Sequence, residues 1–151
     1  MNTFDLSITE LGNQLGVPGL SLDENGICTI SFERTWSLTI THDTELGLVI
    51  FHTDLGAIPQ SDLLSVQSLL LEANVLWCGT GGATFGVVPG SRRVILSFQE
   101  RSEQIDTDTL LGVVESFQAL AQFWMSAIRD EAGKISDSPS FEGVGELAMK
   151  V

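Results

Sequence analysis

Basic residues are scarce in this sequence. Its 151 residues include 7 lysines and arginines against 20 aspartates and glutamates, so the formal net charge is −13. Arg34 is the only basic residue before Arg92. A chain with this charge repels phosphate backbones and anionic lipid surfaces, and its first 91 positions offer no cationic stripe. We therefore expect no nucleic-acid partner and no membrane-surface role.

The sequence pattern also shows no secretory signal at residues 1–5 and no membrane-spanning segment. Residues 1–5 carry no positively charged region of the kind that opens a secretory signal. No apolar run approaches the roughly 18 residues that are needed to cross a bilayer. The two cysteines, Cys28 and Cys78, lie 50 positions apart, which in a reducing compartment favours two small core thiols over a disulfide. These features predict a cytosolic protein without membrane insertion.

Charged residues are few compared with apolar ones. They make up 18% of the chain against 43% apolar residues, whereas soluble domains average about 25% charged residues. The length fits one domain, for which we expect residues 1–130, followed by a polar, turn-rich tail at 131–151. The surplus apolar surface predicts an oligomer interface or a partner-binding groove.

Hydrophobic periodicity predicts three helices and five strands. Helices are expected over 3–15, 61–77 and 108–129, and strands over 27–32, 36–41, 46–53, 83–88 and 93–99. The first helix ends at Gly16 and Pro18, and the last two strands form a hairpin around Pro89-Gly90-Ser91. The expected fold is α+β, in the order α-β-β-β-α-β-β-α. Its sheet is twisted, mainly antiparallel and packed by helices.

The predicted helix over 61–77 opens with Ser61-Asp62 as cap and first-turn acid, and it has two apolar arcs instead of one. The broad arc contains Leu63, Val66, Leu69, Leu70, Ala73, Leu76 and Trp77. The second arc contains Leu64, Leu71 and Val75. Because a surface helix needs only one apolar stripe, the second arc predicts contact with another body, most simply the same helix of a second copy.

The residues that carry chemistry form no catalytic pattern. The glycine cluster at 79–86 lacks the Lys of a phosphate-binding loop and leads into a strand, which favours a flexible turn. Cys28, Cys78, His42 and His52 would make a Cys₂His₂ set, but they lack the close pairwise spacing of zinc sites. No nucleophile elbow is present. We expect a binding protein and not an enzyme, without a metal or a cofactor.

Several of these segments resemble one known family. They are Leu22-Asp23-Glu24-Asn25-Gly26-Ile27-Cys28 before the first strand, the run from Leu70 to Trp77 followed by the run from Gly81 to Gly86, and a last helix containing Phe117 and Trp124. Over about residues 3–130, the chain resembles the class I type III secretion chaperones, the family of the Tir chaperone CesT. The resemblance implies a homodimer in the bacterial cytoplasm that binds the N-terminal region of a secreted effector in extended form. It also makes the secretion-apparatus ATPase a candidate partner.

The resemblance assigns expected roles to particular residues. The family's dimer helix corresponds to 61–77, so the expected dimer interface is Leu64, Leu71 and Val75. The expected effector-binding residues are Phe4, Ile8 and Leu11 on the first helix and Trp36, Leu38 and Ile40 on the sheet. The alternative for both sets is that these side chains complete the core of the subunit.

Two other functions remain open at this point. An acidic immunity-type or adaptor protein would bind a folded basic partner through carboxylates such as Asp43, Glu45 and Asp54, and its complex would be sensitive to salt. A chaperone would bind an unfolded segment mainly through apolar contacts. A small enzyme of another kind is the third possibility, which a bound metal or cofactor would favour.

Overall fold

The computed structural model describes residues 2–129, which fall into two compact units. The first unit comprises residues 2–52 and 99–119, and the second comprises residues 53–98 and 120–129. The predicted tail at 131–151 lies outside the described residues. Each unit is described by itself below.

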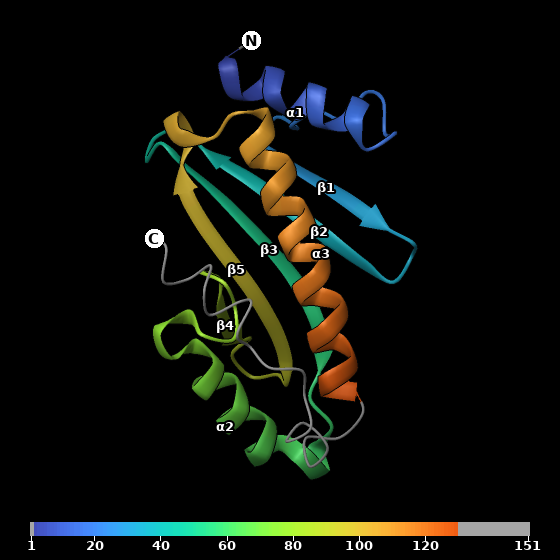
Figure 1. Cartoon of the computed structure of the whole chain (residues 1–151), viewed down its shortest axis with the longest axis vertical. Helices are drawn as coiled ribbons and strands as arrows, with labels where there is room; N and C mark the ends of the chain where they lie inside the picture. Colours follow the sequence, from blue (N-terminus) through green and yellow to red (C-terminus); the bar gives the residue numbers. More distant parts are fainter. Residues whose placement is uncertain (1, 130–151) are drawn as a thin grey trace. The chain divides into compact units, whose positions relative to one another are not determined.

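The helices and strands follow the predicted order α-β-β-β-α-β-β-α (Figure 1). The elements are α1 (Thr3–Gln14), β1 (Ile27–Phe32), β2 (Trp36–Asp43), β3 (Leu48–Ala57), α2 (Leu63–Asn74), β4 (Thr84–Val87), β5 (Arg93–Arg101) and α3 (Thr107–Arg129). Short 3-10 helices precede α2 (η1, Gln60–Asp62), follow it (η2, Val75–Trp77) and precede α3 (η3, Ser102–Gln104). The five strands form one sheet in the order β1-β2-β3-β5-β4, so β1 and β4 are its edge strands. The predicted α+β fold is confirmed.

In the first unit, a capping box begins α1. The Asn2 side chain accepts the backbone N–H of Asp5 at 2.8 Å, and the Asp5 carboxylate accepts the backbone N–H of Asn2 at 3.2 Å. These bonds satisfy donors that a helix N-terminus leaves unpaired. The rings of Phe4 and His42 lie 4.7 Å apart, so the buried face of α1 packs on β2.

The strands of the first unit show the alternation that a half-buried antiparallel sheet requires. Cys28 pairs with Ile40, and Ile40 pairs with Phe51, across β1, β2 and β3. All three side chains are buried. The rings of Phe51 and Phe117 lie 6.3 Å apart, which places the first half of α3 on this buried face. The first three predicted strands thus form an antiparallel meander.

The second unit is built around the β4–β5 hairpin. Phe85 pairs with Leu96, and the backbone N–H of Val88 donates to the carbonyl of Arg93 at 2.9 Å. The Phe85 ring meets Trp124 of α3 edge-to-face, with ring centroids 4.8 Å apart. The apolar residues of α3 at helical spacing are buried: Leu110, Val114 and Phe117 in the first unit, and Ala121, Trp124 and Ile128 in the second.

Two predicted elements have different ends in the structure. β3 extends to Ala57, four positions beyond the predicted end. The predicted helix over 61–77 is regular only from Leu63 to Asn74. The cap and first-turn acid expected at Ser61-Asp62 were also wrong, because Asp62 itself is the residue before α2. The Asp62 side chain makes no capping hydrogen bond, and the Ser65 hydroxyl instead donates to the Asp62 carbonyl at 3.1 Å.

Candidate functional site

The outer face of α2 carries large apolar side chains with no cover in the described chain. Leu64 is 81% exposed, Leu71 67% and Val75 61%. These are the residues of the second predicted arc, whereas Val66, Leu70 and Ala73 of the broad arc are buried. Within residues 2–129, the second arc therefore does not complete the core. An apolar surface of this kind on a small protein indicates an interaction site.

The chain that follows α2 adds to this surface. Leu76 is 78% exposed and Trp77 47% exposed, although both belong to the broad arc that was expected to pack on the sheet. That prediction was wrong because the helix ends first, and both residues have left-handed backbones with φ of 50° and 55°. Such backbones are unfavourable for bulky residues and occur where surrounding contacts impose them.

Two contacts impose this turn. Gly79 approaches Ala73 so closely that a Cβ on Gly79 would lie 2.6 Å from the Ala73 Cβ. The indole Nε1–H of buried Trp124 donates to the Gly79 carbonyl at 3.2 Å. Only glycine fits at position 79, which gives the glycine cluster a structural role. The turn therefore presents Leu76 and Trp77 outward.

The side chain of Asn74 joins the end of α2 to β4. Its Nδ2 donates to the Phe85 carbonyl at 3.2 Å, and its Oδ1 accepts the Phe85 N–H at 2.9 Å. Because the Val88 N–H bonds to β5, strand alternation directs the backbone groups of Phe85 and Val87 to the outer edge. The Asn74 side chain therefore satisfies the outward backbone groups of Phe85 on the edge strand β4.

A shallow groove lies between α2 and β4, which are neighbours in the second unit (Figure 1). It holds about 190 Å³, and its lining is Gln67, Leu70, Leu71, Asn74, Phe85, Gly86 and Val87. Val87 and Val88 beside it are 37% and 38% exposed. We call Leu64, Leu71, Val75, Leu76, Trp77, Val87 and Val88 the α2–β4 surface; all of them belong to the second unit.

The residues predicted to bind an effector occupy the interior of the first unit. Phe4, Ile8 and Leu11 of α1 are at most 4% exposed, and Trp36, Leu38 and Ile40 of β2 at most 6%. The structure brings both groups together in one core. These six side chains therefore offer little surface to an effector segment that binds on the outside of the first unit.

The edge strand β1 of the first unit has free backbone groups. The Gly26 carbonyl accepts the His42 N–H at 2.8 Å, so alternation directs the backbone groups of Ile27, Thr29 and Ser31 outward. Those of Ile27 are occupied by Asp23, through bonds of 2.9 and 2.8 Å. Thr29 and Ser31 have no such cover among the described residues. An extended segment can add a strand there, a feature that the sequence reading missed because edge position depends on the sheet order.

The two cysteines differ in their surroundings. Cys28 is buried, and this burial, together with the charge of Asp23, raises the pKa of its thiol from 9.0 to about 11. Cys78 is exposed, so its predicted place in the core was wrong; it follows the strained turn at Leu76 and Trp77. Among residues 2–129, no three His, Cys, Asp or Glu side chains cluster in a way that could hold a metal ion.

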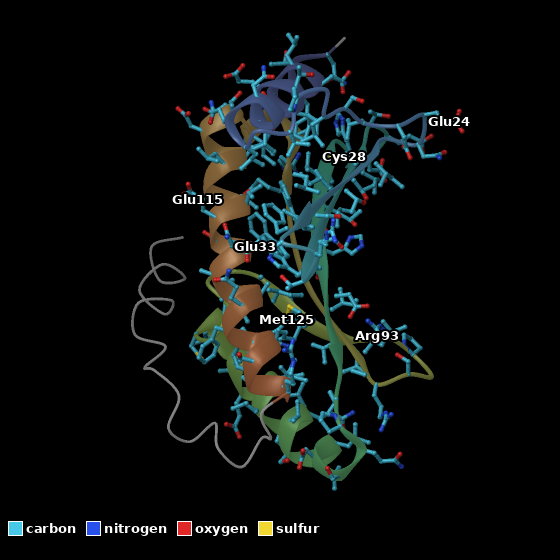
Figure 2. All side chains as sticks on the ribbon, turned by 90° about the vertical axis from the view of Figure 1, so that its right-hand side faces the viewer. Glu24, Cys28, Glu33, Arg93, Glu115 and Met125 are labelled. Carbon is cyan, nitrogen blue, oxygen red and sulfur yellow. The ribbon has the colours of Figure 1, made fainter. Side chains whose placement is uncertain are left out.

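One ion pair lies at the surface of the second unit, between Arg93 Nε and Asp54 Oδ2 at 2.7 Å (Figure 2 labels Arg93). The pKa of the Asp54 carboxyl lies below its ordinary value. Partial burial alone would raise this pKa, but the hydrogen bonds from Arg93 and from the Gly56 N–H, together with the charge of Arg93, lower it by more. Of the carboxylates considered for an adaptor function, Asp54 is therefore already paired.

Comparison with known proteins decides the family. The sequence profile of the Tir chaperone protein (CesT) family matches residues 7–125. The chain belongs to this family. No curated protein sequence matches it. Within residues 2–129, none of the helices has the length and apolar character that spanning a membrane requires.

Solved structures share the CesT-family fold. The ExsC–ExsE complex has a TM-score of 0.70 and 21% identity, and the match covers 82% of this chain and 92% of that one. The HopA1–SchA chaperone–effector complex has a TM-score of 0.65 and 19% identity, covering 85% and 94%. The type III secretion chaperone SycH of Yersinia pestis, in complex with a fragment of YscM2, has a TM-score of 0.64 and 16% identity, covering 80% and 98%. The fold is thus that of known chaperones.

Proposed function

We propose that this protein is a type III secretion chaperone, which binds the N-terminal region of an effector in extended form and keeps it soluble until export. Membership of the CesT family supports this function, as does the fold shared with SchA and SycH. The observation that carries the proposal is the α2–β4 surface, a set of large apolar side chains that are 37–81% exposed. The protein acts in the bacterial cytoplasm, by binding alone, without a cofactor or catalysis.

The α2–β4 surface is the proposed homodimer interface. Leu64 and Leu71 lie on one outward face of α2 and exposed Val75 directly follows its end, so the same segment of a second copy can cover them symmetrically. Burial of such side chains contributes roughly 1.5–3 kcal/mol each. Dimerisation therefore removes from water the apolar surface that the single chain leaves exposed.

The proposed effector site is the outer edge of β1 in the first unit. The free backbone groups of Thr29 and Ser31 can pair with an extended segment, and such pairing tolerates many sequences. The six residues predicted from the family support this site indirectly. Phe4, Ile8 and Leu11 hold α1 against β2, the strand that pairs with β1. Direct contact with those side chains would require α1 to move.

Co-expression with the product of the adjacent reading frame tests this function. The expected complex contains two copies of this chain and one effector, whose N-terminal segment resists limited proteolysis. Because apolar contacts and backbone pairing dominate, the complex should survive about 0.5 M salt, at which the Debye length is only a few ångströms. A complex that protects no segment and dissociates with salt would instead support an adaptor for a folded basic protein. Recruitment of the secretion-apparatus ATPase is a separate step to be tested with this complex.

A further inference from the structure

The α2–β4 surface has a concave part and an outward-facing part, and both belong to the second unit. The concave part is the groove of about 190 Å³ between α2 and β4, whose apolar lining includes Leu71, Phe85 and Val87. The outward-facing part is the turn after α2, where Leu76 is 78% exposed and Trp77 47%. Neither of these two residues lines the groove of its own chain. The groove therefore stays open beside a large aromatic side chain that is only half covered.

The chain holds this turn in place before any partner binds. The backbone N–H of Gly79 donates to the Ala73 carbonyl at 3.0 Å. The N–H of Gly81 donates to the Trp77 carbonyl at 3.1 Å, and the indole of buried Trp124 binds the Gly79 carbonyl. The left-handed backbone of Trp77 is thus set by the fold. Docking of its side chain therefore orders little additional backbone and loses little conformational entropy.

The charges of the two units differ, and the difference favours one surface for contact with a second copy. The described residues of the first unit include twelve acidic and two basic side chains, whereas those of the second unit include three of each. Two copies that met through their first units would bring like charges together, which opposes association. Two copies that meet through their second units avoid this repulsion. The second unit is therefore the part of the chain that suits contact with a copy of itself.

We propose that two copies interlock, with the Trp77 side chain of each copy seated in the groove between α2 and β4 of the other. A two-fold symmetric interface joins the same patch on both chains, so an inserted side chain needs its receiving groove on that same patch. The α2–β4 surface meets this requirement, because Asn74 lines the groove and Trp77 follows it by three positions (Figure 1). The inference rests on the proposed function in taking a second copy as the partner. It goes further by naming the contact that dominates the affinity.

The groove suits an indole in both volume and chemistry. Its volume is several times the ~30 Å³ share of one water, so a ring fills it better than a methyl group does. Leu71 and Phe85 give it apolar walls, and Gln67 adds a side-chain amide that forms no hydrogen bond within residues 2–129. A buried indole N–H needs an acceptor, which the Gln67 side-chain carbonyl supplies. Tryptophans seated in such pockets are enriched among the residues that dominate binding energy.

Variants of Trp77 test this contact in the full-length protein. Trp77→Ala should weaken the dimer at least about 30-fold in light scattering over a dilution series, the range of an interface hot spot. Val17→Ala shortens an apolar side chain that is 41% exposed in the first unit, and it should leave the dimer unchanged. Trp77→Gly should repeat the loss with a residue that tolerates the left-handed backbone, which separates it from a folding defect. Folded Trp77 variants that dimerise like the wild type would overturn the proposal.

Fluorescence locates the indole of Trp77 directly. The other two tryptophans of the chain, Trp36 and Trp124, are 6% and 0% exposed. The difference between the emission spectra of the wild type and Trp77→Phe isolates the contribution of Trp77. We expect a short-wavelength contribution, typical of a buried indole, in the dimer. The same comparison in a Leu71→Asp background should give the long-wavelength emission of an indole in water. Long-wavelength emission of Trp77 in the wild-type dimer would contradict its place in the groove.

A double-variant cycle identifies the receiving groove. Leu71 lines the groove, whereas Leu64 on the same face of α2 does not. Trp77→Ala combined with Leu71→Ala should weaken the dimer by less than the product of the two single effects, because both remove one contact. Trp77→Ala combined with Leu64→Ala should give the full product. Full products for both pairs would show that Trp77 does not meet Leu71.

The outcomes distinguish this pairing from the chaperone function. If Trp77→Ala kept the dimer and lost the effector complex, the groove would receive an effector side chain, and the interlocking of copies would be wrong while the chaperone function stood. A wild-type protein that never dimerises would overturn both the proposed interface and this pairing. A dimer that depends on Trp77, with a buried indole and coupling to Leu71, would support it.

Discussion

The side-chain amide of Asn74 forms two hydrogen bonds with the backbone of Phe85, at 2.9 and 3.2 Å. One side chain of α2 thereby takes the place of a neighbouring strand along β4. Unpaired strand edges attract other chains, so this contact limits pairing at β4 and leaves its apolar side chains as the surface for a partner.

Replacing Asn74 with alanine should destabilise the second unit. It removes two hydrogen bonds, which contribute about 0.5–1.5 kcal/mol each, so the free energy of unfolding should fall by about 1–3 kcal/mol. Urea denaturation measures the change. Asn13→Ala is the control, because Asn13 is exposed and the one hydrogen bond of its side chain among the described residues goes to Glu10, at 3.5 Å. An Asn74→Ala variant as stable as Asn13→Ala would show that the contact contributes nothing.

Leu38 tests the burial of the residues first expected to bind an effector. Its exposed fraction is 0%, so Leu38→Ala should lower the free energy of unfolding by about 2–5 kcal/mol. Leu46→Ala, at a side chain that is 67% exposed, should change it by less than about 0.5 kcal/mol. If Leu38→Ala kept full stability and lost effector binding, Leu38 would be a direct contact residue and the description of the core would be wrong.

The two thiols should react at different rates. Raising the pKa of Cys28 from 9.0 to about 11 lowers its thiolate fraction at pH 8 by about 100-fold, and burial restricts access further. Iodoacetamide should therefore modify Cys78 first, with Cys28 reacting only as the protein unfolds. Peptide mass spectrometry after timed alkylation distinguishes the two sites. Equal rates in the folded protein would contradict the buried position of Cys28.

The ion pair between Asp54 and Arg93 should add to stability in a pH-dependent way. The pKa of Asp54 is lower in the folded protein than its ordinary value, so its contribution is full above the unfolded pKa. The contribution is lost as the pH falls through the lowered folded value. Asp54→Asn should thus be less stable than the wild type at pH 7, and the difference should disappear in acid.

Thermal unfolding of the wild type and of Asp54→Asn between pH 7 and pH 2 measures this difference in stability. Asp62→Asn is the control because the Asp62 side chain makes no capping bond. A difference for Asp54→Asn that stays constant over the whole range would mean that the charge of Asp54 is not responsible.

Local patterns were sufficient to predict most of the fold. β1 begins and ends where predicted, and α3, predicted over 108–129, buries its apolar residues from Leu110 to Ile128. Within α2, Val66, Leu70 and Ala73 of the predicted broad arc are buried, whereas Leu64 and Leu71 of the second arc are exposed. These elements depend on periodicity, which a single sequence shows directly.

The remaining features depend on contacts between distant residues. Leu76 and Trp77 continue the helical pattern, and only the approach of Gly79 to Ala73 and the bond from Trp124 explain why they turn outward. Alternating apolar residues in β2 fit a groove as well as a core, so the sequence could not distinguish them. The free edge of β1 likewise follows from the sheet order.

The most direct test of the central claim is the mass of the purified protein by light scattering, for the wild type, Leu71→Asp and Leu46→Asp. Leu71 and Leu46 are both 67% exposed, but only Leu71 belongs to the α2–β4 surface. We predict twice the chain mass of 16.3 kDa for the wild type and Leu46→Asp, and a single chain mass for a folded Leu71→Asp. A wild-type protein that remains a single chain at all concentrations, or a Leu71→Asp variant that stays dimeric, would contradict the claim that this surface exists to be covered by a second copy.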